Sequence, residues 1–229
     1  MSIEHVGFVF QIIVFLFAIS FHESAHAFTA WKCGDPTAYM LGRVTLNPLK
    51  HIDPVGTVIL PGIALLTGLP VIGWAKPTPV DPRNFKNEVR DDILTSVAGP
   101  ASNILVAAGA VGVMAGIASI SGDGRALVRG LAGNFPIPVA QTSLWVPVVV
   151  LLYQAMLINL LLAVFNLIPI PPLDGSHVLR HLLPESIRQV YDMVGWMGLV
   201  LLFLVGGRVV FTLLQPVLRF FDALLLLLA

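Results

Sequence analysis

Long apolar runs separated by short polar stretches make up most of this sequence. A transmembrane helix needs about 20 mostly apolar residues to cross a hydrocarbon core of roughly 30 Å, and several runs are long enough. These runs predict helices at residues 6–32, 55–69, 92–120, 140–168 and 190–214. The apolar tail at residues 220–229 is expected at the membrane interface. The pattern therefore predicts an all-α polytopic membrane protein with about five to six transmembrane helices.

The composition supports a membrane protein and excludes a water-soluble globular protein and a nucleic-acid-binding protein. Of the 229 residues, 56% are apolar and 11% are charged, whereas roughly 25% of the residues of an ordinary soluble domain are charged. The 13 basic and 13 acidic residues cancel, so the chain lacks the basic excess that neutralises nucleic-acid phosphates. No polar stretch is long enough for a soluble domain. We therefore expect one domain over residues 1–229, embedded in the lipid bilayer, and no nucleic-acid partner.

The second apolar run leads into a segment rich in proline and glycine. Pro77 and Pro79 exclude a helix there, because proline lacks an N–H and restricts the residue before it to extended backbone. We therefore expect a re-entrant or extended loop near residues 71–86. Irregular backbone at membrane depth is tolerated only where it is buried in protein or lines a water-filled cavity, so this loop is a candidate cavity wall.

The first apolar run contains the pattern His22-Glu23-Ser24-Ala25-His26. Residues four apart share one face of a helix about 6 Å apart, so both imidazoles can reach one zinc ion at roughly 2.0–2.1 Å. Glu23 lies about 100° round the helix from His22, close enough to act as general base on a water. At a helix end facing water these residues could be structural. Inside an apolar span each ionisable side chain costs about 2.5 kcal/mol or more, which favours the zinc interpretation.

A hydrolytic zinc site has three protein ligands, so the two histidines leave one to be found. Cys33 lies about 10 Å along the axis from His26 by helical rise, which is too far. Polar residues that are more simply interpreted as capping or surface residues are His51, Asp53, His177 and His181.

Asp174 is the remaining candidate for the third ligand. It follows a stretch that begins at Asn166, in which three prolines end the fourth predicted helix, and Gly175 after it permits a tight turn. The carboxylate is thereby expected on non-helical backbone beside the apolar helices. A helix stop followed by a solvated aspartate would have a similar sequence, so both interpretations stay open at this point.

Three further residues are candidates for substrate binding. Asn103 is an amide inside the third apolar run, where an interhelical hydrogen bond is the ordinary role and a bond to a substrate carbonyl or oxyanion is the alternative. Asn166 and the loop from Gly73 to Phe85 are candidates to line a polar channel for water. Trp74 begins the stretch from Trp74 to Val80, which is a candidate for strand-like pairing with a substrate.

Together these motifs resemble the site-2 protease family of intramembrane zinc metalloproteases. The motifs are His22–His26, Arg43-Val44-Thr45-Leu46-Asn47-Pro48, His51-Ile52-Asp53-Pro54, Gly73-Trp74-Ala75-Lys76-Pro77, Gly99-Pro100-Ala101-Ser102-Asn103 and Asn166–Gly175. An HExxH motif alone is a moderate signal. Its combination with a proline-rich Asp-Gly motif far along an apolar chain is highly specific.

The resemblance implies that His22, His26 and Asp174 bind one zinc ion per chain, that Glu23 is the general base and that Asn103 lies near the substrate carbonyl. It also implies a metal site within the membrane, toward the cytoplasmic side. The sequence departs from many relatives in two features. The HExxH helix is the first span, and no room is left for a PDZ domain. A compact member of the family is therefore expected.

The expected function is that of a zinc metalloendopeptidase for regulated intramembrane proteolysis. As a multi-pass protein of the cell membrane, it would hydrolyse peptide bonds within or beside transmembrane segments of membrane-protein substrates. The alternatives are a membrane metal or ion transporter and an inactive relative that binds transmembrane segments. Glu23 between the two histidines, without acidic relay residues in the other spans, argues against the transporter. The intact motifs argue against the inactive relative.

Overall fold

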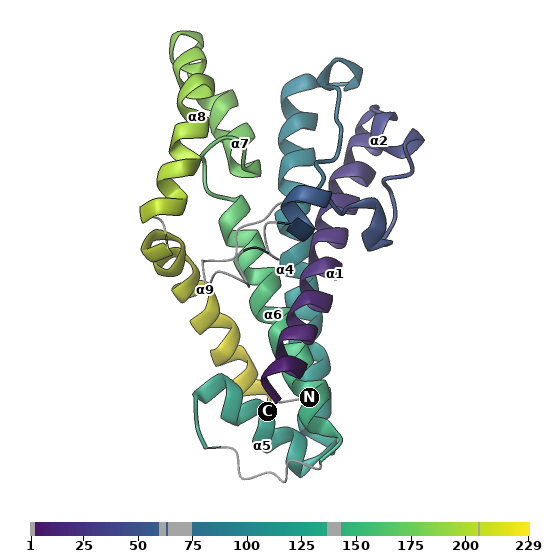
Figure 1. The fold of residues 1–229 in the computed structure, drawn as a ribbon, viewed down its shortest axis with the longest axis vertical. Coiled ribbons are helices and arrows are strands. Elements are labelled where there is room, and N and C mark those ends of the chain that lie inside the picture. The colour runs from purple at the N-terminus through teal and green to yellow at the C-terminus, as the bar shows by residue number, and fades with distance from the viewer. Residues whose placement is uncertain (1–2, 60–62, 64–74, 137–142, 206) are drawn as a thin grey trace. The chain divides into compact units, whose positions relative to one another are not determined.

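The computed structural model describes residues 3–59, 63, 75–136, 143–205 and 207–229, and this part of the chain contains helices and no β-strand. The predicted all-α class is thereby confirmed. Along the chain the elements are α1 (Ile3–Cys33), α2 (Thr37–Met40), η1 (Pro48–Lys50), η2 (Pro54–Ile59), η3 (Pro82–Asn84), α4 (Glu88–Ile120), α5 (Gly122–Gly133), α6 (Trp145–Asn166), α7 (Asp174–Leu182), α8 (Glu185–Val205) and α9 (Gly207–Leu228), as labelled in Figure 1.

Four helices in the described part of the chain are long and apolar enough to cross a membrane, judged by length and composition. They are Phe10–Cys33, Glu88–Ile120, Trp145–Asn166 and Gly207–Leu228. Large apolar side chains remain exposed along them, such as Leu105 and Ile120 of α4. Exposed apolar side chains on a long apolar helix are typical of a membrane span.

The prediction of a single helix at residues 190–214 is wrong. The structure has two helices there, because α8 ends at Val205 and α9 begins at Gly207. The helix of this region that is long and apolar enough to cross a membrane is α9, Gly207–Leu228, which extends beyond the predicted end at residue 214. The apolar tail at residues 220–229 belongs almost entirely to α9, which ends at Leu228.

The helix predicted at residues 55–69 lies mostly outside the described residues. Its described start is a π-helix, Pro54–Ile59. Asp53 caps this helix, since its Oδ1 accepts hydrogen bonds from the backbone N–H of Val55 at 3.0 Å and of Gly56 at 2.7 Å. The interpretation of Asp53 as a capping residue is thereby confirmed.

The predicted loop at residues 71–86 is described from Ala75 onward. Residues 75–81 form neither helix nor strand, and the short turn η3 follows them. The expectation of non-helical backbone after the two prolines is confirmed for this part of the loop.

The chain divides into two compact units. Unit 1 consists of Met1–Ala18 and Asn103–Ala229, and unit 2 consists of Ile19–Ser102. The single membrane domain over residues 1–229 remains a prediction.

Unit 1 is built around an apolar core. Within it α5 packs against both α6 and α9, and α6 packs against α9 (Figure 1). The largest fully buried side chains of this core include Met114, Leu127, Met156 and Leu225. Closely packed apolar side chains therefore make up most of this core, and buried hydrogen bonds such as that from Asn103 to Asn159 add to them.

Two short helices of unit 1 were not predicted, because they have too few apolar residues to be recognised as spans. Ser121 caps α5 by accepting a hydrogen bond from the backbone N–H of Gly124 at 3.1 Å. The helix α7 begins at Asp174, preceded by Leu173 in extended conformation. The expectation that Asp174 lies on non-helical backbone is therefore wrong, and its position in a first helical turn is favoured by the helix dipole.

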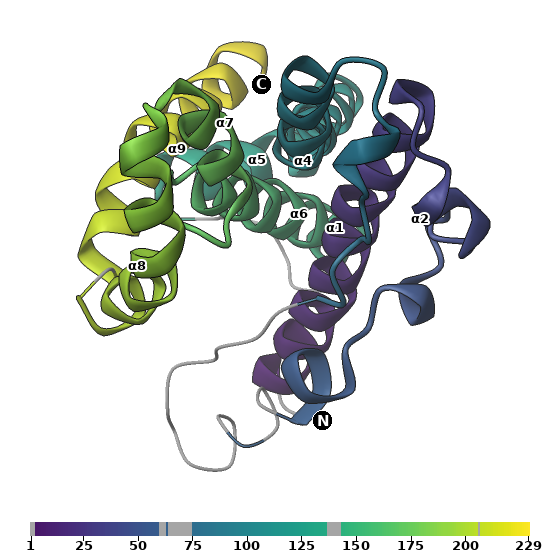
Figure 2. The ribbon, with the colours of Figure 1, turned by 90° about the horizontal axis from the view of Figure 1, so that it is seen from above.

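Unit 2 contains the second half of α1, the start of α4 and the loops between them. The short helix α2 lies beside the end of α1 (Figure 2). The Tyr39 ring stacks there on the Trp31 ring with a centroid distance of 4.5 Å. Contacts of this kind fix the chain as it leaves the apolar helix.

Asp35 ties the end of α1 to the loop that precedes α4. Its buried carboxylate accepts hydrogen bonds from the backbone N–H of Thr37 at 3.1 Å, from the Thr37 hydroxyl, from Asp81 N at 2.8 Å and from Asn84 Nδ2 at 2.9 Å. Burial by itself raises the pKa of Asp35, but the hydrogen bonds outweigh it, so the pKa lies below its ordinary value. The ionised form therefore stabilises this junction.

Candidate active site

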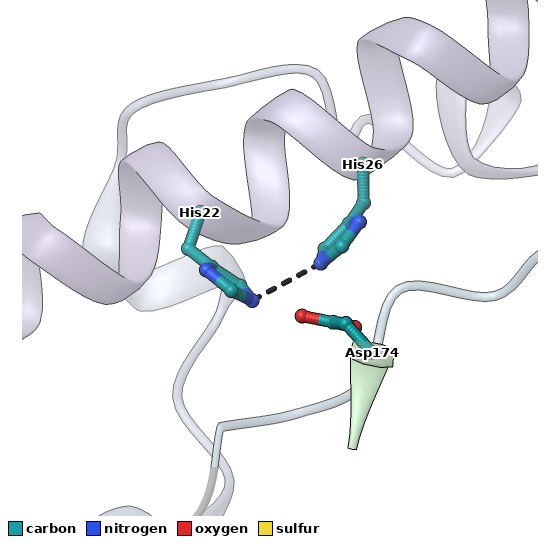
Figure 3. A group of neighbouring side chains, drawn as sticks. All are labelled: His22, His26 and Asp174. Carbon is teal, nitrogen blue, oxygen red and sulfur yellow. Dashed lines mark hydrogen bonds between the residues drawn. The ribbon is translucent and has the colours of Figure 1, made fainter. Parts of the chain in front are cut away.

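His22 and His26 lie on the same face of α1, one helical turn apart. Both side chains are buried, and their Nε2 atoms are 3.1 Å apart, as the dashed line in Figure 3 marks. Two nitrogens that bind one zinc ion tetrahedrally at 2.0–2.1 Å would lie roughly 3.4 Å apart. The spacing between the two imidazoles therefore suits a shared metal ion.

The carbonyl group of Thr95 on α4 orients the His26 ring. His26 Nδ1 lies 2.7 Å from Thr95 O. A carbonyl oxygen only accepts, so Nδ1 carries a proton and donates it, which in the neutral ring puts the lone pair on Nε2. A histidine ligand is commonly fixed in this way by a hydrogen bond at its second nitrogen.

The helix α4 also comes close to both imidazoles at Gly99. A Cβ atom at this position would lie 2.3 Å from His26 Nε2 and 2.7 Å from His22 Cε1 and Nε2. No larger residue fits there without displacing the histidines. The missing side chain thus leaves a space in front of the two nitrogens that a metal would bind, and the donor atoms beside that space fit zinc.

Glu23 is held by the loop that precedes α4. The backbone N–H of Thr78 donates to Glu23 Oε2 at 3.0 Å, and the Thr78 hydroxyl lies 2.6 Å from the same oxygen. The carboxylate between the two histidines therefore has a defined orientation.

Buried polar residues anchor the stretch that leads to Thr78. Lys76 N donates to His51 O at 2.9 Å, and the Arg43 guanidinium donates to Lys76 O. His51 Nε2 donates to Thr45 O at 2.8 Å. Burial lowers the pKa of His51, because the charged imidazolium loses its solvation, so the neutral ring is favoured. These contacts support the structural interpretation of His51.

Asp174 belongs to unit 1, where its surroundings are rigid. A Cβ atom at Gly175 would lie 2.2 Å from Leu167 O, so only glycine fits in the turn that carries the aspartate. The Tyr191 hydroxyl of α8 donates to Pro169 O at 2.9 Å and holds the proline-rich stretch. A turn precedes α7, with Leu173 N donating to Ile170 O at 2.9 Å, whereas Gly175 lies in the first turn of α7 and not in the tight turn predicted for it. Figure 3 draws the Asp174 side chain.

Asn103 is fully buried in unit 1 and makes interhelical hydrogen bonds. Its Nδ2 donates to Ala18 O at 3.2 Å and to Asn159 Oδ1 at 2.7 Å. An amide nitrogen has two N–H donors, so both are in use, and one bond would have to break before Asn103 could donate to a substrate carbonyl. The structure supports the interhelical role.

The remaining substrate-binding candidates and surface histidines lie apart from these contacts or outside the described residues. Asn166 donates from Nδ2 to Leu162 O at 3.0 Å, within its own helix α6. Trp74 lies outside the described residues. His177 and His181 lie on α7, and His177 is exposed, in keeping with their interpretation as surface residues.

Sequence reasoning did not single out Thr78, Thr95 or Gly99. Thr78 and Gly99 stand within or beside motifs that carry the family resemblance, but motif spacing does not say which side chain faces Glu23 or the histidines. The alternation Pro77-Thr78-Pro79 was the available signal for Thr78, since it indicates a side chain on a fixed, extended backbone. Thr95 contacts His26 through its backbone carbonyl group, which every residue has, so the residue type could not indicate this contact.

Comparisons with known proteins agree with this site. The model of "Peptidase family M50" matches residues 10–205. "Putative zinc metalloprotease YwhC" of Bacillus subtilis (strain 168) is 35% identical over 179 residues, which are 78% of this chain and 71% of that protein. "Putative zinc metalloprotease Rip2" of Mycolicibacterium smegmatis is 31% identical over 205 residues, 88% of this chain and 69% of that protein. No solved structure matches the chain.

The family match includes the helix with His22, Glu23 and His26 and extends past Asp174. It covers most of the chain, and the resemblance to the site-2 proteases is thereby confirmed. The chain belongs to peptidase family M50.

Proposed function

We propose that this protein is a zinc-dependent intramembrane protease that hydrolyses peptide bonds within or beside transmembrane segments of membrane-protein substrates. The observation that carries the proposal is the pair of buried imidazoles, with Nε2 atoms 3.1 Å apart, on a helix apolar enough to cross a membrane. Ionisable side chains are costly at that depth and are functional candidates by default. Family membership and the names of two relatives support the same class of enzyme.

We further infer that His22, His26 and Asp174 hold one zinc ion per chain. Two imidazoles and one carboxylate are a ligand set found in zinc hydrolases. Figure 3 draws the side chains of the three residues to which this proposal assigns the metal. When bound, zinc supplies activation of a water molecule and polarisation of the scissile carbonyl group.

Glu23 is the proposed general base. Its Oε2 is held by Thr78, and Oε1 is assigned to take a proton from the attacking water and return it to the leaving amine. Thr95 keeps the proton of His26 on Nδ1, and Gly99 keeps the space beside the two Nε2 atoms open. Each residue thus has a role that its contacts support.

A transmembrane substrate has to unwind before it can react. Its peptide carbonyls are engaged in helical hydrogen bonds, and breaking these in hydrocarbon leaves polar groups unsatisfied at several kcal/mol each. The extended stretch of residues 75–80 provides backbone groups for replacement bonds in a strand-like pairing. Residues that weaken the substrate helix near the cleaved bond should therefore speed the reaction.

The proposed location follows from the four apolar helices. A protein with several helices of this length is expected to be a multi-pass protein of the cell membrane, with the lipid bilayer and a transmembrane substrate as its partners. Regulated proteolysis of a membrane protein is the physiological process that this arrangement suits.

The test combines metal analysis with cleavage of a model transmembrane substrate in proteoliposomes. The wild-type protein should contain about one zinc ion per chain and cleave the substrate. Glu23→Gln should keep the zinc and lose roughly 100- to 10,000-fold in cleavage rate. Glu185→Gln, at an exposed ion pair with Arg188, is the matched control and should keep both properties.

Three outcomes would contradict the proposal. These are a wild-type protein without zinc, a Glu23→Gln variant that cleaves at the wild-type rate, and zinc movement across the vesicle without proteolysis, which would favour the transporter.

A substrate series with Gly or Pro introduced beside the cleaved bond tests whether the substrate helix has to unwind. Each Gly should lower the cost of unwinding by up to about 1 kcal/mol and each Pro by about 3 kcal/mol relative to Ala. Equal rates across that series would show that unwinding does not limit the reaction.

A further inference from the structure

Thr78 is the residue of the loop before α4 that reaches Glu23. Its backbone N–H donates to Glu23 Oε2 at 3.0 Å, and its Oγ1 lies 2.6 Å from Oε2 and 3.1 Å from the backbone oxygen of Glu23. A hydroxyl has one proton, and the shorter contact to a charged acceptor makes the stronger bond. A single residue therefore directs two donors at one oxygen of the carboxylate.

The backbone that carries Thr78 is constrained on both sides. Lys76 and Thr78 each precede a proline, which restricts both residues to extended backbone. On one side Lys76 N donates to His51 O at 2.9 Å, and on the other Asp81 N donates to Asp35 Oδ2 at 2.8 Å. The branched side chain of Thr78 also has few χ1 rotamers. Thr78 is thus a rigid support between two anchored points.

This support acts on the most mobile part of Glu23. A glutamate has three side-chain torsions, and the last one, which turns the carboxylate, has a broad energy minimum. Two bonds to Oε2 hold that torsion and direct Oε1 away from Thr78. A base that is misplaced by about 1 Å can lose roughly 100-fold in rate, so an orientation fixed before substrate binds has a large effect.

We propose that Thr78 is a positioning residue, whose hydroxyl holds the carboxylate of Glu23 so that Oε1 faces the attacking water. This inference rests on the proposed function, because it concerns the residue proposed there as general base. It adds a role for the loop before α4 that is separate from metal binding and from pairing with the substrate backbone.

The experiment compares Thr78→Val, which keeps the shape and the backbone N–H but removes the hydroxyl, with Thr78→Ser, which restores the hydroxyl. Thr78→Val should lower kcat roughly 10- to 100-fold, with KM changed by less than about twofold and zinc content unchanged. Thr78→Ser should return kcat to within about threefold of wild type.

Thr37→Val is the matched control. It removes the same kind of bond, a threonine hydroxyl on a buried carboxylate, from Asp35 in the same unit. It should lower the unfolding temperature and leave kcat unchanged. If Thr37→Val lowers kcat as much as Thr78→Val does, general loosening of unit 2 explains the loss and the positioning role is overturned.

Other results also decide the question. A wild-type kcat in Thr78→Val, a failure of Thr78→Ser to restore kcat, or loss of zinc from Thr78→Val would each overturn the inference. Wild-type protein and Glu23→Gln are measured in the same assay. If both fail to behave as proposed, the proposed function fails, whereas an active wild type with an inactive Glu23→Gln confines any failure to Thr78.

Discussion

Units 1 and 2 differ in the kind of interaction that stabilises each of them internally. In unit 2 the residues around Glu23 are joined by directional bonds, such as those from Thr78 to Glu23 and from His26 to Thr95. In unit 1 the core consists of apolar side chains such as Met156 and Leu225. Hydrogen bonds depend steeply on distance and angle, whereas the burial of apolar surface is favourable without a preferred direction. The difference suggests that unit 2 sets the orientation of reacting groups and unit 1 supplies stability.

The largest expected effect comes from a residue of unit 1 that the proposal gives a role in chemistry. Asp174→Ala should weaken zinc binding by more than roughly 100-fold and leave no measurable cleavage, because it removes a ligand and not only a supporting contact. Zinc affinity is measured by competition with a chelator, in parallel with the cleavage assay.

The controls for Asp174→Ala are other residues with ligand atoms. His177→Ala, His181→Ala and Cys33→Ala should keep their zinc. If one of these variants loses the metal while Asp174→Ala retains it, the assignment of the third ligand is wrong and the division of roles between the units has to be redrawn.

The next largest effect is expected from Gly99→Ala in unit 2. The added Cβ would lie 2.3 Å from His26 Nε2, so either the imidazole or α4 has to move. Zinc affinity should fall roughly 10- to 100-fold, with a parallel loss of cleavage. Gly109→Ala on the same helix should change neither, because in the described part of the chain no atom beyond the neighbouring helix backbone lies within 4 Å of the added Cβ. Normal zinc binding by Gly99→Ala would show that the pocket is less rigid than its directional bonds indicate.

A change in the core of unit 1 should affect stability and not chemistry. Met156→Ala leaves a cavity beside fully buried neighbours and should lower the free energy of unfolding by about 2 kcal/mol, at the lower end for such changes because lipid is as apolar as the core. Denaturation in mixed detergent micelles measures this loss. Met197→Ala, at an exposed position of α8, is the control. A reduced kcat per folded molecule in Met156→Ala would contradict the claim that the core of unit 1 affects stability and not the reaction.

The smallest effect is expected at Asp35 and depends on pH. Asp35→Asn removes a charge that accepts several hydrogen bonds and should lower the free energy of unfolding by about 1.5 kcal/mol at neutral pH. Since the folded state lowers the pKa of Asp35, its stabilisation is complete above the unfolded pKa of about 3.9 and is lost as the pH falls through the lower folded value.

The measurement for Asp35 is the difference in unfolding free energy between wild type and Asp35→Asn over a pH series. The difference should shrink below about pH 4. Asp192→Asn, at an exposed ion pair with Arg180, should cost less than about 1 kcal/mol. A difference for Asp35→Asn that grows toward low pH would contradict the lowered pKa.

Local patterns predicted much of the fold. The helices expected at residues 6–32, 92–120 and 140–168 correspond to α1, α4 and α6. The helix expected at 190–214 is wrong, because the membrane-spanning candidate there is Gly207–Leu228 and a continuous apolar run does not reveal where one helix ends and the next begins. The helix α5 was missed because it is short and partly polar, so its packing against α6 and α9 stabilises it more than its own periodicity indicates.

The sequence by itself determined the pairing of His22 with His26, because the repeat of an α-helix is local and places residues four apart on one face. It also determined the extended backbone around Thr78, since proline restricts its neighbour whatever the rest of the chain does. Only the tertiary structure decided that Thr78 holds Glu23, 55 residues away, and that Thr95 orients His26, 69 residues away. Such contacts depend on how helices and loops pack, and periodicity along a chain contains no information about them.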